Sequence, residues 1–192
     1  ETEKSMWSHL VRGAVKAGWA GLVPSYTLAP VAPLSEMTRE VATAIRQAAA
    51  EIAGPIVISG HSAGGHLCMR MGCADRPLGE DTGRVARILG ISGLYDLRPL
   101  MKTSMNRELR IDEAEALAES PALLRPAGGI DIVSWVGGAE RPEFIRQSAL
   151  LANIWAGLGA PPQLVIDEGL HHFNVIAGLS EAGSEITRRW VG

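Results

Sequence analysis

A short apolar run leads directly into a glycine-flanked serine, and this junction constrains the fold more than any other feature. Residues 55–59 read Pro-Ile-Val-Ile-Ser, and residues 60–64 read Gly-His-Ser-Ala-Gly. The run predicts a buried strand, and the apolar positions that follow predict a helix. A G-x-S-x-G pentapeptide in this context is typical of a sharp turn that lifts a serine hydroxyl, here Ser62 Oγ, above the end of a sheet. We expect a side chain at Gly60 or Gly64 to collide where strand and helix cross.

Predicted strands and helices alternate along the rest of the chain. This order indicates an α/β fold, with a mostly parallel sheet, helices on both faces and a single domain over residues 1–192. The strands read as apolar runs without alternation, as in sheets that are covered on both faces, and they span residues 19–24, 55–59, 84–91, 130–136 and 163–167. The helices span residues 5–17, 35–52, 63–73, 142–158 and 172–191. The polar, irregular stretch 99–127 is interpreted as a small lid segment.

Composition excludes several classes of partner. The chain has 192 residues, a net charge of −3 and no basic block, so we expect no nucleic-acid or membrane-surface partner. No apolar run approaches the roughly 20 residues of a membrane span. Cys68 and Cys73 are five apart on one predicted helix, which is a poor spacing for a disulfide or a metal, and nothing requires an oxidising compartment. We therefore predict packed thiols and a cytoplasmic location.

Reactive side chains follow three predicted strands in the order serine, acid, histidine. Ser62, Glu140 and the pair His171-His172 each come just after a strand, and the carboxyl ends of parallel strands meet at one edge of a sheet. A serine hydroxyl needs an adjacent base, a histidine can take and return its proton, and a carboxylate fixes the imidazole tautomer. We favour a nucleophilic Ser62 over a buried serine cap, with either histidine as the base.

Other candidates have simpler interpretations. Asp96 also follows a strand, and we interpret it as a turn or cap carboxylate. His61 either lines a substrate pocket or holds the turn by a hydrogen bond, whereas His66 is expected to pack inside its helix. Tyr95 and Phe173 are the aromatic residues that we place near a substrate. The five histidines form no H-E-x-x-H pattern, so no catalytic metal is predicted.

Several segments together resemble kynurenine formamidases (arylformamidases) and related α/β-hydrolase esterases. The resemblance covers essentially the whole chain and lies in residues 25–30 (SYTLAP), 60–67 (GHSAGGHL), 91–100 (ISGLYDLRPL), 136–144 (VGGAERPEF) and 171–173 (HHF). Any one of these motifs is shared with many esterases, and the set is more specific. The resemblance implies an α/β-hydrolase fold.

The resemblance also implies the roles of individual residues. Ser62, Glu140 and His172 would form the catalytic triad, since the family has Asp-His-Phe around its histidine and often Asp at the position of Glu140. The backbone N–H of Ala63 would supply half of an oxyanion hole. His61, Tyr95 and Phe173 remain the candidates for substrate contact.

The implied activity is hydrolysis of N-formyl-L-kynurenine to kynurenine and formate in tryptophan catabolism, without a cofactor. The alternatives are a carboxylesterase of small acyl esters and a non-catalytic α/β-hydrolase-like binding protein. A formamidase needs a polar clamp for the amino-acid end of its substrate, and Arg98, Arg141 and Asn106 are the candidates. The expected partner is a small molecule, an aryl formamide or an ester, and a homodimer is left open.

One family segment is missing from this sequence. The family carries a His-Gly-Gly-x-Trp segment a little before the stretch that looks like residues 4–9, and its amides form the other half of the oxyanion hole. The chain opens on Glu1-Thr2-Glu3 without a methionine, so we expect an N-terminally truncated hydrolase that lacks the first strands. Residues 1–192 alone should then be poorly active, since one lost oxyanion donor typically costs about 10²–10³ in turnover, and an exposed sheet edge should weaken the fold.

Overall fold

Four parallel strands form the centre of the molecule. The structure is a computed structural model that describes residues 4–75 and 77–192. The strands lie in the order β1 (Ile56–His61), β2 (Val85–Ile91), β3 (Asp131–Gly137) and β4 (Gln163–Asp167), and each neighbouring pair is parallel. Such a sheet confirms the α/β class predicted from the alternating pattern. Glu1–Glu3, on which the expectation of a missing upstream segment partly rests, lie outside the described residues.

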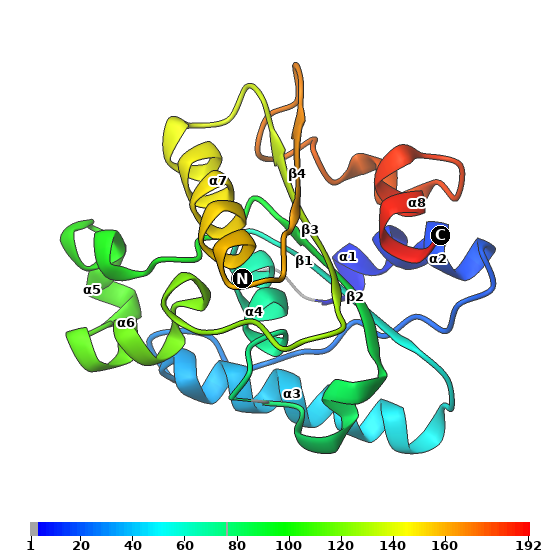
Figure 1. Cartoon of the computed structure of the whole chain (residues 1–192), viewed down its shortest axis with the longest axis horizontal. Coiled ribbons are helices and arrows are strands. Elements are labelled where there is room, and N and C mark those ends of the chain that lie inside the picture. The colour runs from blue at the N-terminus through cyan, green and yellow to red at the C-terminus, as the bar shows by residue number, and fades with distance from the viewer. Residues whose placement is uncertain (1–3, 76) are drawn as a thin grey trace.

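Helices cover both faces of this sheet (Figure 1). On one face lie α4 (Ala63–Met71) and α7 (Pro142–Gly157), with α3 (Leu34–Glu51) packed on α4. On the other face lies α8 (Glu185–Val191), next to α2 (Arg12–Lys16). The remaining helical elements are α1 (Lys4–Trp7), α5 (Asn106–Leu109), α6 (Glu113–Glu119) and the 3₁₀ turns Ser8–Val11, Gly79–Arg84, Arg98–Lys102, Pro121–Leu123 and Ala177–Ser180.

The sheet separates two hydrophobic cores. Alternate residues of a strand point to opposite faces, so Ile88 and Ile132 pack toward α4 and α7, whereas Leu89 and Val133 pack toward α8. All four side chains are almost completely buried. Burial on both faces explains why the strand sequences show no polar alternation.

Two predicted elements are wrong. Residues 19–24 form no strand; Ala20, Gly21 and Leu22 are exposed, and no described strand pairs with them. A strand needs a hydrogen-bonded neighbour, and the apolar sequence alone does not supply one.

The predicted closing helix 172–191 is short. It begins only at Glu185, because Ser184 is its N-cap and accepts a hydrogen bond from the N–H of Thr187. Turns and a 3₁₀ turn occupy residues 173–184 instead.

Residues 98–126 pack beside the sheet as short helical pieces. Glu119 at the end of α6 is buried, pairs with Arg70 of α4 at 3.2 Å and accepts a hydrogen bond from Thr38 of α3 at 2.6 Å. Opening of residues 99–127 as a lid stays a prediction. Cys68 and Cys73 are both buried free thiols, in line with the sequence. Across the described ranges, no helix is both long enough and apolar enough to span a bilayer.

Candidate active site

A polar side chain of the candidate site follows the carboxyl end of each strand, either directly or after a turn. Ser62 follows β1, Ser92 follows β2, Glu140 lies in the turn after β3, and His172 lies in the segment after β4. The strands are parallel and adjacent, so their carboxyl ends bring these four residues, far apart in sequence, to one edge of the sheet.

The turn between β1 and α4 holds Ser62 in a backbone conformation that few non-glycine residues adopt. Its φ is 56° and its ψ is −115°, and its N–H donates to the carbonyl of Ile91 at 2.9 Å. A Cβ at Gly60 would lie 2.0 Å from the carbonyl oxygen of Gly64, and a Cβ at Gly65 would lie 2.6 Å from that of Ile91. These glycines are needed because backbones cross there at close range.

The steric prediction for Gly64 itself is wrong. A Cβ built on Gly64 meets nothing within 4 Å. The close approach at this turn therefore involves the backbone of Gly64 and the missing side chain of Gly60, and not the missing side chain of Gly64.

A chain of two hydrogen bonds links the serine, the histidine and the acid. His172 Nε2 lies 3.1 Å from Ser62 Oγ, and His172 Nδ1 lies 2.6 Å from Glu140 Oε2. An ionised carboxylate only accepts, so the hydrogen bond assigns the ring proton to Nδ1 and leaves Nε2 as an acceptor for the serine hydroxyl. The structure thus brings Ser62, Glu140 and His172 together in the geometry that a nucleophile, its base and an orienting acid require.

The carboxylate of Glu140 is completely buried, and each of its two oxygens has a hydrogen-bond partner. Its side chain is 0% exposed. Oε1 accepts from the hydroxyl of Ser92 at 2.5 Å and from the N–H of Gly137 at 3.0 Å, while Oε2 faces His172. A buried charge of this kind is tolerated only when donors surround it.

Aromatic rings hold the imidazole of His172 from several sides. Phe144 of α7 stacks on it with ring centroids 4.3 Å apart, and His61 lies 4.5 Å away at a tilt of 44°. Phe173 meets it edge-on at 5.5 Å. Burial, reinforced by the neighbouring His172, lowers the pKa of His61 to about 4. His61 is therefore neutral at pH 7, and its Nε2 is buried without a hydrogen-bond partner in the described chain.

The other predicted residues lie apart from this chain of hydrogen bonds. His171 is exposed, and its ring contacts the backbone of Phe173 instead of Ser62. Tyr95 is 0% exposed within the core, a position that argues against contact with a substrate. Phe173 is 81% exposed beside His172. Asp96 is a turn carboxylate paired with Arg98, as the sequence indicates.

Sequence reasoning missed Ser92 and Phe144 as parts of the site. Ser92 follows a strand end just as Ser62 does, so its position in the sheet was an available signal. Phe144 lies in the segment 136–144 that carries the family resemblance, but nothing in that segment indicated that its ring contacts His172.

The N-terminus of α4 offers free backbone donors beside Ser62. The first N–H groups of a helix, beginning here with that of Ala63, have no partner within the helix, and the Ser62 side chain does not cap them. Such donors favour negative charge. No group of three or more side chains suited to hold a metal ion occurs among residues 4–75 and 77–192.

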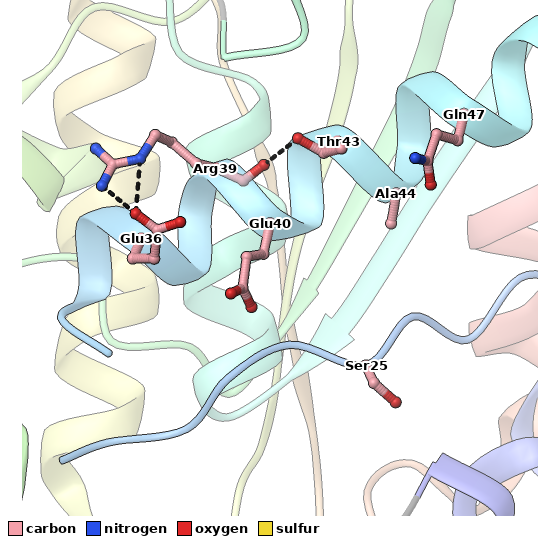
Figure 2. A pocket seen from close by; sticks show the side chains of 7 residues that line it. All are labelled: Ser25, Glu36, Arg39, Glu40, Thr43, Ala44 and Gln47. Carbon is pink, nitrogen blue, oxygen red and sulfur yellow. Dashed lines mark hydrogen bonds and ion pairs between the residues drawn. The ribbon is translucent and has the colours of Figure 1, made fainter. Parts of the chain in front are cut away.

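A groove on another part of the described chain does not belong to this site. It has a volume of about 470 Å³ and lies between α3 and the extended segment at Ser25 (Figure 2). Polar side chains of α3, including Glu36, Arg39 and Glu40, line it, and none of the residues around Ser62 does. We therefore locate the candidate site from the hydrogen-bond geometry and not from the groove.

Curated relatives of this chain include fish enzymes. It is 29% identical to the kynurenine formamidase of Salmo salar over 187 residues and 27% identical to that of Danio rerio over 183 residues. Each alignment covers 91% of this chain and 62% of the relative, so the chain spans less than two thirds of the length of these proteins.

Solved structures match the whole fold. A candidate thioesterase from Silicibacter sp. is 42% identical, with a TM-score of 0.93, over 100% of this chain and 71% of that protein. An esterase of Pyrobaculum calidifontis is 17% identical, with a TM-score of 0.76, over 97% of this chain and 70% of its own, a likeness of fold alone. The family model of the alpha/beta hydrolase fold matches residues 2–169, most of the chain. The chain therefore belongs to the α/β hydrolase family.

Proposed function

We propose that this chain carries the active site of a serine hydrolase in which Ser62 is the nucleophile, His172 the general base and acid, and Glu140 the residue that orients His172. The single observation that supports this proposal most strongly is the hydrogen-bond chain from Ser62 Oγ through His172 to Glu140, with distances of 3.1 and 2.6 Å. The α/β hydrolase family and the 42% identical candidate thioesterase support the same class of reaction.

The proposed reaction has two steps. His172 Nε2 takes the proton of Ser62 Oγ as the oxygen attacks the acyl carbon, and the N–H of Ala63 donates to the developing oxyanion. His172 then gives its proton to the leaving group, so the scissile bond breaks and an acyl-serine remains. Water attacks that ester with His172 again as base. When the bond between the acyl carbon and Ser62 Oγ breaks, His172 returns the proton to Oγ, and the carboxylic acid is released. Glu140 stabilises the imidazolium in both steps.

We propose an aryl formamide, N-formyl-L-kynurenine, as the substrate, with kynurenine and formate as products. The fish kynurenine formamidases support this assignment, and an exposed arginine next to the acid suits the substrate's carboxylate. Arg98 is already paired with Asp96, and Asn106 binds the backbone of Ile111, so Arg141 is the clamp that we propose.

A second candidate is hydrolysis of small esters or thioesters by the same residues. The 42% identity to a candidate thioesterase supports it. Binding without catalysis is the third outcome, and the complete hydrogen-bond chain argues against it.

Initial rates on three substrates test these proposals. N-formylkynurenine, p-nitrophenyl acetate and a small acyl thioester are compared in the full-length protein and in its Ser62→Ala variant. Preference for the formamide, abolished by Ser62→Ala, is the expected result. Preference for the ester or thioester would replace the substrate assignment, and absence of any Ser62-dependent turnover would overturn the hydrolase itself.

A further inference from the structure

The end of β2 contacts both the serine and the acid of the proposed triad. The carbonyl of Ile91 accepts from the N–H of Ser62 at 2.9 Å, and the hydroxyl of the next residue, Ser92, donates to Glu140 Oε1 at 2.5 Å. β2 lies between β1 and β3, the strands that lead to Ser62 and to Glu140. Two consecutive residues thus connect the backbone of the nucleophile to the carboxylate of the acid.

Ser92 has a backbone conformation that non-glycine residues rarely adopt. It is fully buried, its φ is +50°, and its N–H is held by the carbonyl of Trp135 at 2.8 Å. A non-glycine residue at positive φ is strained, and glycine would adopt this conformation without cost. What serine adds over glycine here is the hydroxyl, and the hydrogen bond that this hydroxyl donates goes to Glu140.

We propose that Ser92 is a positioning residue that fixes the carboxylate of Glu140 so that Oε2 faces His172. The inference rests on the proposed function, in which Glu140 orients His172. Two donors, the Ser92 hydroxyl and the Gly137 N–H, hold Oε1 in place. With only the Gly137 N–H left, the carboxylate can turn about its last bond, and the imidazole loses its fixed partner.

Three variants distinguish the effect of removing the Ser92 hydroxyl from the effect of relieving the backbone strain. Ser92→Ala removes the hydroxyl and keeps the Cβ at positive φ, whereas Ser92→Gly removes the hydroxyl and relieves the strain. Ser148→Ala is the matched control, because Ser148 of α7 is equally buried and its Oγ has no hydrogen-bond partner in the described chain. The measurements are kcat and KM for the best substrate and urea unfolding of the full-length protein.

We expect activity to depend on whether the hydroxyl of residue 92 is present, and stability to depend on the backbone strain at that residue. Both Ser92 variants are expected to lose about 10–100-fold in kcat with KM almost unchanged, because misplacement of a catalytic group slows the chemical step. Ser92→Gly should be at least as stable as Ser92→Ala, and Ser148→Ala should keep the parental kcat. The proposal is overturned if both Ser92 variants keep the kcat of Ser148→Ala, or if Ser92→Gly recovers what Ser92→Ala loses.

A second readout keeps this inference separate from the proposed function. If the parent protein has no Ser62-dependent turnover, the proposed function fails, and proton NMR still tests Ser92. The Nδ1 proton of His172, bonded to Glu140, should give a downfield resonance that His172→Ala removes. Both Ser92 variants are expected to shift or broaden it, and Ser148→Ala to leave it in place. An unchanged resonance in the Ser92 variants would refute the positioning role.

Discussion

At the residue scale, two glycines of one motif have different surroundings. We predict that Gly60→Ala abolishes the folded protein or its activity, because the new Cβ would lie 2.0 Å from the carbonyl oxygen of Gly64. Gly64→Ala meets no atom within 4 Å and lies inside α4, where alanine is favoured over glycine by about 0.5–1 kcal/mol. Urea unfolding of both variants checks the prediction, and equal loss of stability in the two would contradict it.

The proposed clamp gives a second prediction at this scale. Arg141→Ala should raise KM for N-formylkynurenine by about tenfold, because a charge-assisted hydrogen bond to the substrate carboxylate is lost. KM for p-nitrophenyl acetate, which has no carboxylate, should not change. Arg98→Ala is the control, since Arg98 is already paired with Asp96. Equal effects of Arg141→Ala on both substrates would remove Arg141 from substrate recognition.

The order of the reactive residues could be predicted from the sequence, but the residues that position them could not. Ser62, Glu140 and the pair His171-His172 could be placed because each follows an apolar run that becomes a strand, and the family resemblance selected His172 from that pair. The proposed role of Ser92 depends on its positive φ and on its hydrogen bond to Glu140. No local sequence pattern predicts either feature. Tyr95 was predicted to lie near a substrate, yet its ring lies in the core against Gly90 and Gly93.

At the element scale, most strands and helices follow from hydrophobic runs, and the failures have local causes. The strands after residue 55 were predicted within about two residues, because both faces of each are buried. Residues 19–24 have a similar composition, but no strand of the described residues pairs with them, and pairing is a property of two segments. The last helix was predicted too long because the N-cap at Ser184 was not recognised.

Within residues 98–126, a buried ion pair between Glu119 and Arg70 attaches α6 to α4. Glu119→Ala is expected to destabilise the protein by about 3–5 kcal/mol, because it leaves the guanidinium of Arg70 buried beside only its second partner, Asp75. The measurement is the free energy of unfolding in urea. Glu36→Ala, which removes the exposed partner of Arg39, is the control and should have no measurable effect. A similar small effect of Glu119→Ala would mean that α6 is held by packing alone.

At the scale of the whole molecule, the sheet unites the two cores and the site. One core lies toward α4 and α7 and the other toward α8, so both faces fix the same four strands. The strand ends then set the distances between Ser62, Glu140 and His172. Any change that loosens the sheet should therefore reach the site, and global stability and the geometry of catalysis are linked.

His66, which is buried, and His61, which is partly buried, make that stability depend on pH. Burial lowers the pKa of His61 and of His66 from 6.5 to about 4 in the folded protein. As the pH falls below 6.5, these histidines become protonated in the unfolded chain but stay neutral in the folded chain. The stability present above pH 6.5 is therefore lost progressively toward pH 4. Each histidine should lower the free energy of unfolding by about 1.4 kcal/mol per pH unit in this range.

Urea unfolding between pH 7 and pH 4.5 tests this slope in the parent, in His66→Gln and in His9→Gln. His66→Gln should have the shallower slope, because one group that charges only on unfolding is gone. His9 is exposed, so His9→Gln should keep the parental slope and controls for the loss of a histidine as such. Carboxylates also titrate near the lower limit, but they are the same in all three proteins and cancel in the comparison. Identical slopes for the two variants would show that the imidazole of His66 does not contribute to the acid unfolding of this protein.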